Sequence, residues 1–156
     1  MNRIIFLINI ILIPFLSIGQ ITLIPDSNFE TALINLGYDS ILDGEINTYS
    51  INNIDTLNVM YKNIDDLTGI EDFTNLTVLK CDQNNLTNLD VSSNNNLIKL
   101  TCTYNQLTNL ILNNNMTSLE CYYNNLTTLD FSSCHYLEVV KCSFNNLITL
   151  DVSNNI

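Results

Sequence analysis

Apolar residues recur along residues 76–147 with one fixed spacing. Each copy places apolar side chains at its first, fourth and eleventh positions, a cysteine at the sixth and an asparagine at the ninth. The copies are 76–86, 97–107, 116–126 and 137–147, so they begin 21, 19 and 21 residues apart. The short step falls in the turn between Leu110 and Met116. A weaker copy over 54–64 carries Lys62 at the asparagine position.

A repeat of this length is typical of a solenoid, in which each repeat forms one coil. The inward apolar positions predict one short strand per coil, stacked on its neighbour at the ~4.8 Å spacing of parallel strands. The repeat is too short for a full helix. We therefore expect mostly strand and loop over 54–156, in about five coils of which the last is incomplete.

The asparagines at the ninth position predict a second periodic feature. Stacked coils would place their amides in a buried ladder, where they satisfy backbone groups of the loops that would otherwise lose water without a partner. We interpret these residues as structural: Asn84, Asn105, Asn124 and Asn145.

The segment before the repeats, residues 20–53, is predicted to cap the first coil. Ser27 and Glu30 have the spacing of a capping box, and Phe29, Leu33 and Leu36 fall on one helical face. Gly37 is placed to end this short helix. The acidic stretch 39–45 is similar to a calcium loop but lacks oxygen ligands at two of its positions, so we interpret it as a plain turn.

Residues 1–19 have the pattern of a cleaved signal peptide. Arg3 precedes a run of apolar residues, and Ser17 and Gly19 offer small side chains before a cut near Gln20. The alternative is a membrane anchor, but the run is short of the ~20 residues of a span and contains Pro14. We expect export, cleavage and no membrane insertion afterwards.

The last coil predicts an open end. Ile156 follows Leu150 by six residues, the spacing that separates Leu110 from Met116, so it would start a further coil. Solenoid ends need a cap to keep inward side chains from water. The expectation is either a longer protein or association through this end.

The charge balance narrows the possible partners. The sequence contains sixteen Asp and Glu residues but five Lys and Arg residues, which gives a formal net charge of −11. Such a field repels phosphate backbones and anionic lipids. Nucleic acid is therefore excluded as a partner.

The cysteines do not match a metal site or a disulfide framework. Those of the repeats are never two to four residues apart, and parallel stacked thiols rarely reach disulfide torsions. We expect Cys81, Cys102, Cys121 and Cys142 to be buried free thiols. Cys134, beside His135, is expected near the surface.

Catalytic groups are scarce. The single histidine, His135, is expected on a turn, and four glycines leave no phosphate-binding loop. Asp82 and Glu120 would lie about 10 Å apart across two coils, which is outside the window for a glycosidase pair. We predict no enzyme, no cofactor and no metal.

An aromatic series precedes the ladder asparagines. The residue before each ladder position is Tyr61, Gln83, Tyr104, Tyr123 or Phe144, and Tyr122 lies beside them. On the outward strand face of a solenoid such rings can bind a partner, or they can simply pack across strands. Both interpretations stay open. The candidate binding residues are Tyr61, Tyr104, Tyr122, Tyr123 and Phe144.

These motifs resemble the leucine-rich-repeat family. Residues 63–76 are similar to the 22-residue repeats of bacterial internalins, whereas the later repeats and Ile24-Pro-Asp-Ser-Asn-Phe-Glu30 resemble secreted proteins of Bacteroidetes. The resemblance implies an α/β-type solenoid, a right-handed coil with one parallel strand per repeat and a short N-terminal helix. Many Bacteroidetes relatives also carry a C-terminal sorting domain.

The resemblance implies recognition as the function. Family members bind proteins or glycans, so we expect a secreted or surface-presented module that binds through its concave strand face. The alternative is a structural spacer, the N-terminal part of a larger secreted protein whose active module lies beyond residue 156.

Overall fold

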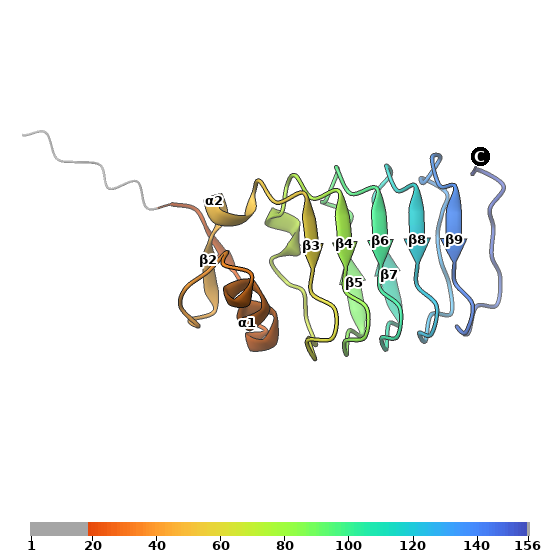
Figure 1. Ribbon diagram of the computed structural model, residues 1–156. Helices are drawn as coiled ribbons and strands as arrows, with labels where there is room; N and C mark the ends of the chain where they lie inside the picture. The colour runs from red at the N-terminus through yellow and green to blue at the C-terminus, as the bar shows by residue number, and fades with distance from the viewer. Residues whose placement is uncertain (1–18, 156) are drawn as a thin grey trace, which may run out of the picture.

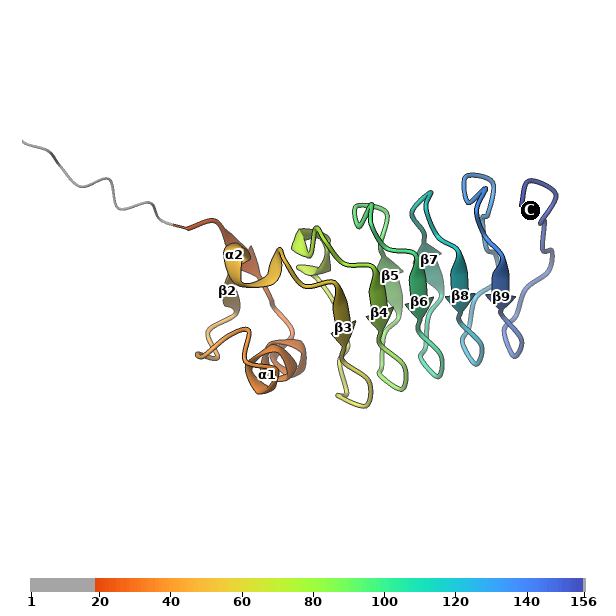
Figure 2. The ribbon, with the colours of Figure 1, turned by 45° about the horizontal axis from the view of Figure 1, so that its top comes forward.

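The computed structural model describes residues 19–155 as an elongated stack of coils with a small cap at one end (Figures 1 and 2). The proposed signal peptide lies almost wholly outside the described residues, as does Ile156. Within 19–155, no helix is long and apolar enough to cross a membrane.

The cap contains β1 (Ile21–Leu23), α1 (Ser27–Asn35), β2 (Glu45–Asn47) and α2 (Thr48–Ile51). The coils contain short strands and one 3-10 helix, Ile70–Asp72. The strands are β3 (Thr56–Asn58), β4 (Val78–Lys80), β5 (Asn88–Asp90), β6 (Lys99–Thr101), β7 (Asn109–Ile111), β8 (Ser118–Glu120) and β9 (Val139–Lys141).

Five of these strands form one parallel sheet in the order β3-β4-β6-β8-β9, one strand per coil. The fourth position of every repeat stays in register, since Leu57, Leu79, Leu100, Leu119 and Val140 are aligned across the strands. The 19-residue step leaves this register unchanged. The predicted fold class, a solenoid with a parallel strand per repeat, is confirmed.

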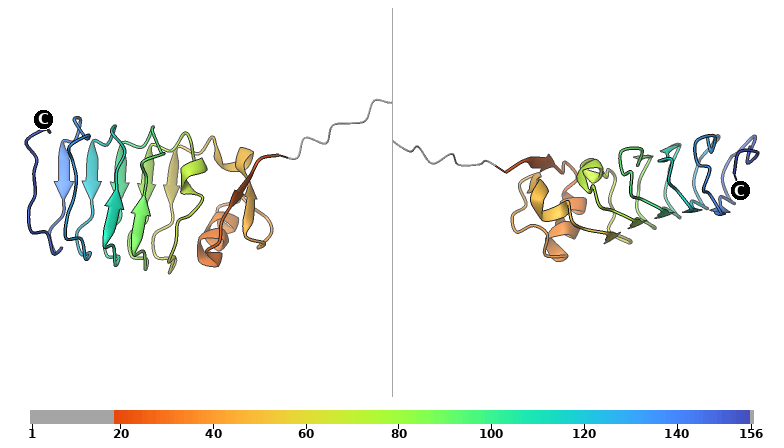
Figure 3. Two further views of the ribbon diagram at one scale, coloured as in Figure 1. Left: turned by 180° about the vertical axis from the view of Figure 1, so that it is seen from behind. Right: turned by 90° about the horizontal axis from the view of Figure 1, so that it is seen from above.

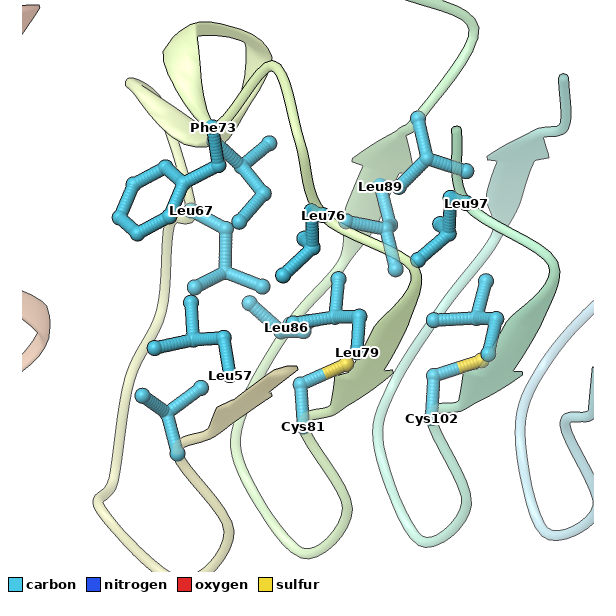
Figure 4. Close-up of a cluster of buried hydrophobic side chains, with 14 of the residues drawn as sticks. Leu57, Leu67, Phe73, Leu76, Leu79, Cys81, Leu86, Leu89, Leu97 and Cys102 are labelled. Carbon is cyan, nitrogen blue, oxygen red and sulfur yellow. The ribbon is translucent and has the colours of Figure 1, made fainter. Parts of the chain in front are cut away.

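A smaller parallel pair, β5 and β7, lies across the coils from the main sheet (Figure 3). The space between them holds the core, where leucines from both sides meet the cysteines of the sixth position (Figure 4). Leu57, Leu79 and Leu100 are fully buried, and so are Cys81 and Cys102. Each coil thus buries its apolar edge only against the coils beside it.

The cap helix begins one residue earlier than its sequence suggests. Asp26, not Ser27, is the N-cap: its Oδ1 accepts hydrogen bonds from the backbone N–H groups of Asn28 and Phe29. The proposed capping box is therefore wrong. The end of the helix is as expected, because Gly37 adopts a φ of 81° and donates to the carbonyl of Ile34.

Two carboxylates explain why the box does not form. The Oδ2 atom of Asp26 accepts from the N–H groups of Asp65 and Asp66, which ties the helix to the first coil. Glu30 is buried and its Oε1 accepts from the N–H groups of Asp43 and Gly44, 2.8 and 2.7 Å away. Glu30 therefore organises the acidic turn 39–45 instead of returning to the start of its own helix.

The ninth-position asparagines hold adjacent coils together. The Oδ1 of Asn105 accepts from the N–H of Leu86 at 3.0 Å, and its Nδ2 donates to the carbonyls of Cys81 and Cys102 at 3.0 and 3.2 Å. Asn84, Asn124 and Asn145 make the corresponding bonds in their coils. Each amide thus bridges its own coil and the preceding one.

Replacing Asn105 with alanine is expected to lower the free energy of unfolding by about 1–3 kcal/mol, because buried backbone groups on two coils lose their partners. Urea denaturation measures this loss. Its neighbour Gln106 is exposed, so Gln106→Ala serves as the matched control with little expected effect. Equal losses in the two variants would contradict a stabilising ladder.

A second series of inward polar side chains includes the residues three positions before Leu97, Met116 and Leu137. Asn94 donates to the carbonyl of Ile70 at 2.7 Å, and Asn113 donates to the carbonyls of Asn94 and Leu97. Cys134 takes the next place and donates to the carbonyl of Asn113 at 3.3 Å. Asn155 then donates to the carbonyl of Cys134.

The expectation that Cys134 lies near the surface is therefore wrong. The residue is fully buried, because it replaces an asparagine that points inward and not one on an exposed turn. Among the five cysteines, all free thiols, only Cys142 is partly exposed. It belongs to the last coil, where Leu150 and Val152 are also about half exposed.

Candidate functional site

The aromatic candidates share an unusual backbone position. Each of the five residues before a ladder position lies three residues after the end of a strand of the main sheet. All have left-handed backbone: Tyr61 (φ 58°), Gln83 (54°), Tyr104 (54°), Tyr123 (56°) and Phe144 (56°). This conformation is uncommon for residues other than glycine, asparagine and aspartate, and for a bulky side chain it is costly.

This position differs from the one expected. The strands end before these residues, so the rings lie on the turns at the carboxyl ends of the strands, along one edge of the sheet (lower edge in Figure 1). The outward strand face itself carries mostly polar and charged side chains, together with Val78 and Val139. The left-handed backbone at these residues turns the chain out of the strand direction, so their rings do not lie on the outward strand face.

Three of the rings form a stack across successive coils. The ring centres of Tyr104 and Tyr123 are 4.5 Å apart with planes at 15°, and those of Tyr123 and Phe144 are 4.2 Å apart at 2°. The stack repeats the spacing of the strands beneath it. Both faces of Tyr123 are therefore covered by rings, whereas its edge stays exposed.

Tyr122 adds a fourth ring at an angle to the stack. Its centre lies 5.7 Å from Tyr104 and 5.9 Å from Tyr123, edge-on to both. With Tyr104, Tyr123 and Phe144 it forms what we call the aromatic row. Beside the row is a depression of about 760 Å³, lined by Tyr122, Tyr123, Val140, Lys141, Cys142, Ser143 and Phe144.

Tyr61 is separated from the aromatic row. Gln83 occupies the position between them, and its Nε2 donates a hydrogen bond to the hydroxyl of Tyr61 at 2.7 Å. Tyr61 is 62% exposed, compared with 46% for Tyr104, 40% for Tyr123 and 65% for Phe144. The structure thus brings four of the five candidate residues together and leaves Tyr61 apart.

Tyr104 is neutral at physiological pH. Desolvation, followed by the nearby hydroxyls of Tyr123 and Tyr122, raises the pKa of Tyr104 above its ordinary value. Its hydroxyl can therefore donate as well as accept hydrogen bonds.

The outward face of the sheet carries a charge pattern that the sequence analysis missed. Lys80, Lys99 and Lys141 all lie on this face, three of the four lysines in the described residues. Glu120 is paired with Lys141 at 3.0 Å. The face is thus locally less negative than the rest of the chain. The alternation of an inward leucine or valine with an outward lysine in β4, β6 and β9 could have revealed it.

The two carboxylates weighed as a catalytic pair are both bound within the protein. The Oδ1 of Asp82 accepts from the N–H and Oγ of Thr103, and its Oδ2 accepts from Thr101 at 2.6 Å. Only 6% of Asp82 is exposed, and Glu120 is engaged by Lys141. Asp82 therefore organises the turn, and the geometry offers no acid–base pair on this face.

No model of a known protein family matches this sequence. No curated protein matches it by sequence either. Similar solved structures do exist, and three of them are internalins of Listeria monocytogenes. Internalin InlF matches over 80% of this chain and 45% of its own, at 21% identity with a TM-score of 0.55.

Two further internalins match over most of this chain with lower TM-scores. The functional domain of InlJ, described as including a cysteine ladder, matches over 88% of this chain and 46% of its own, at 25% identity with a TM-score of 0.46. Internalin C2 matches over 88% of this chain and 93% of its own, at 19% identity with a TM-score of 0.40. This chain spans less than half the length of InlF and of the InlJ domain.

The chain has the leucine-rich-repeat fold. The InlF match over 80% of this chain, with a TM-score of 0.55, supports this fold. The predicted resemblance to internalins is thus confirmed at the level of fold. Export and the Bacteroidetes-type repeat stay predictions.

Proposed function

We propose that this leucine-rich-repeat chain is a recognition module that binds a protein partner through its aromatic row. The observation that carries the proposal is the stack of Tyr104, Tyr123 and Phe144, each held in a left-handed backbone conformation. Bulky residues in strained positions tend to be found at functional sites. Asparagine would fit the same turns without strain, as Asn63 does at a φ of 56°.

The geometry of the stack favours a protein over a glycan. Sugars pack against the faces of aromatic rings, but both faces of Tyr123 and one face of Tyr104 are covered. The exposed ring edges and the adjacent depression suit an apolar side chain of a partner. Tyrosine at the centre of an interface often contributes much of the binding energy.

The proposed setting is outside the cell. The apolar leader over residues 1–19 supports export by a cleaved signal peptide, after which the partner would be met in solution or at a cell surface. Tyr61 stays in the proposed site as an outlying contact. The fold's internalin neighbours are consistent with binding, and no catalytic step is proposed.

The proposal can be tested by selecting peptides from a random library against the purified chain. Tyr123→Asn is expected to weaken the selected peptides about 30-fold, because an interface hot spot contributes about 2 kcal/mol. Asparagine accepts the left-handed backbone, so the variant should keep its fold. Isothermal titration measures the affinity.

Tyr49→Asn is the matched control, since Tyr49 is 77% exposed on the cap, away from the aromatic row. It should leave the affinity unchanged. Peptides that bind both variants equally would contradict the site. Failure to select any peptide would favour the alternative function, a spacer in a larger secreted protein. Glycan binding that Tyr123→Asn abolishes would contradict a protein partner.

A further inference from the structure

A groove of about 440 Å³ runs across three coils at the opposite edge of the sheet from the aromatic row. Its lining residues come from the turns that lead into β6, β8 and β9, at the upper edge in Figure 1. They are Asn95, Asn96, Ile98, Asn115, Thr117, Tyr136 and Glu138.

Each asparagine amide that lines this groove donates one of its two N–H groups to the chain itself. Asn95 donates its Nδ2 to the carbonyl of Ser93, Asn96 to that of Thr74 and Asn115 to that of Asn95, at 3.2, 2.9 and 2.8 Å. The Oγ of Thr117 donates to the carbonyl of Ile98 at 3.0 Å. Each of these amides keeps its carbonyl oxygen as an acceptor and one N–H as a donor.

The charged group in the lining of the groove is a carboxylate. Its amides present carbonyl oxygens, and the carboxylate of Glu138 adds a negative charge. Tyr136 is 60% exposed and Ile98 is 44% exposed, which supplies an aromatic ring and an apolar wall. The lining contains no lysine or arginine.

We propose that this groove binds an organic ammonium group carried on a short apolar chain. Glu138 would pair with the charge, the amide oxygens of Asn96 and Asn115 would accept its N–H donors, and the ring of Tyr136 would attract it through a cation–π interaction. Ile98 would contact the alkyl chain. The groove therefore binds a different ligand from the aromatic row and lies at the opposite edge of the sheet.

Other ligand classes fit less well. An anion would meet the carboxylate of Glu138 and no lysine or arginine. A bare metal ion would meet one carboxylate, and within residues 19–155 no group of three potential metal-ligating residues comes together.

The test is a titration of the full chain with n-butylammonium chloride at low ionic strength, followed by NMR of the Ile98 methyl groups and the Tyr136 ring. Saturable shifts at both residues are expected, whereas 1-butanol and sodium chloride at equal concentration should give none that saturate. Glu138→Gln should weaken binding about fivefold, the upper range for an exposed ion pair. Glu45→Gln, on β2 of the cap, is the matched control.

A second titration identifies the source of the ammonium group. Nα-acetyl-lysine methylamide presents the lysine side chain as a protein does. Saturation by both probes assigns the groove to lysine side chains of a partner, and saturation by butylammonium alone assigns it to free amines. Absence of saturation by either probe, equal shifts with 1-butanol, or unchanged affinity in Glu138→Gln overturns the proposal.

Discussion

Above about pH 9, the free energy of unfolding is expected to fall steeply because of the buried thiols. Burial raises the pKa of Cys121 from its ordinary 9.0 to about 12, and it also raises the pKa values of Cys81 and Cys102 well above their ordinary value. A group whose pKa is higher in the folded state stabilises the fold fully below its unfolded pKa and loses that contribution as the pH rises. Each such thiol should cost roughly 1.4 kcal/mol per pH unit.

Urea denaturation at a series of pH values from 8 to 11 measures this slope. Cys102→Ala removes one of the titrating groups, so its slope should be shallower than that of the unchanged chain by roughly 1.4 kcal/mol per pH unit. Tyrosine ionisation affects both proteins alike and cancels in the comparison. Parallel slopes would show that the thiols ionise as easily in the folded state as in the unfolded one.

Replacing Phe29 with alanine should cost about 3–5 kcal/mol, the usual loss for a large buried aromatic. Phe29 is fully buried on α1 and its ring stacks on Phe73 of the first coil, 6.3 Å between centres. The change therefore removes the main apolar contact between cap and solenoid. The loss should appear in urea denaturation and as faster amide exchange in β3.

Leu36→Ala is the control for this prediction, because Leu36 ends the same helix but is 43% exposed. It should cost under about 1 kcal/mol, in proportion to the smaller area that it buries. Comparable losses in the two variants would mean that the ring contact does not hold the cap in place.

The coils could be predicted from the sequence because the buried fourth position of each repeat determines how that coil aligns with its neighbours. Leu79 and Leu100 sit at the fourth position of their repeats, and only one register buries both. The 19-residue step could be placed in a turn for the same reason. Spacing alone therefore determined the strands, the core and the ladder that includes Asn105.

The sequence analysis failed where a residue's partner comes from another segment. Ser27 and Glu30 have capping-box spacing, but Glu30 binds the N–H groups of a loop thirteen and fourteen residues away, which no local pattern encodes. Cys134 was taken for a turn residue because its place in the series of Asn94 and Asn113 is visible only once the coils are stacked. Its position three residues before Leu137 was the available signal.

The candidate site was only partly predictable. The aromatic residues could be recognised by their fixed place before the ladder, but not their position at the sheet edge, because that depends on the left-handed turn at Tyr104 and Tyr123. The groove beside Tyr136 was not anticipated. Its lining residues occupy variable positions of the repeat, and only stacking places them on one surface.

The ladders also bear on how such a chain can change by duplication and loss of DNA. The side-chain amides of Asn105 and Asn124 bond only to their own coil and the one before it, although the step between these two residues is two residues shorter than the others. A recombination event that adds or removes one whole repeat would therefore recreate the same bonds at the new junction. The recognition surface can in this way be lengthened or shortened in steps of one coil, while selection acts separately on the few side chains that each new coil exposes.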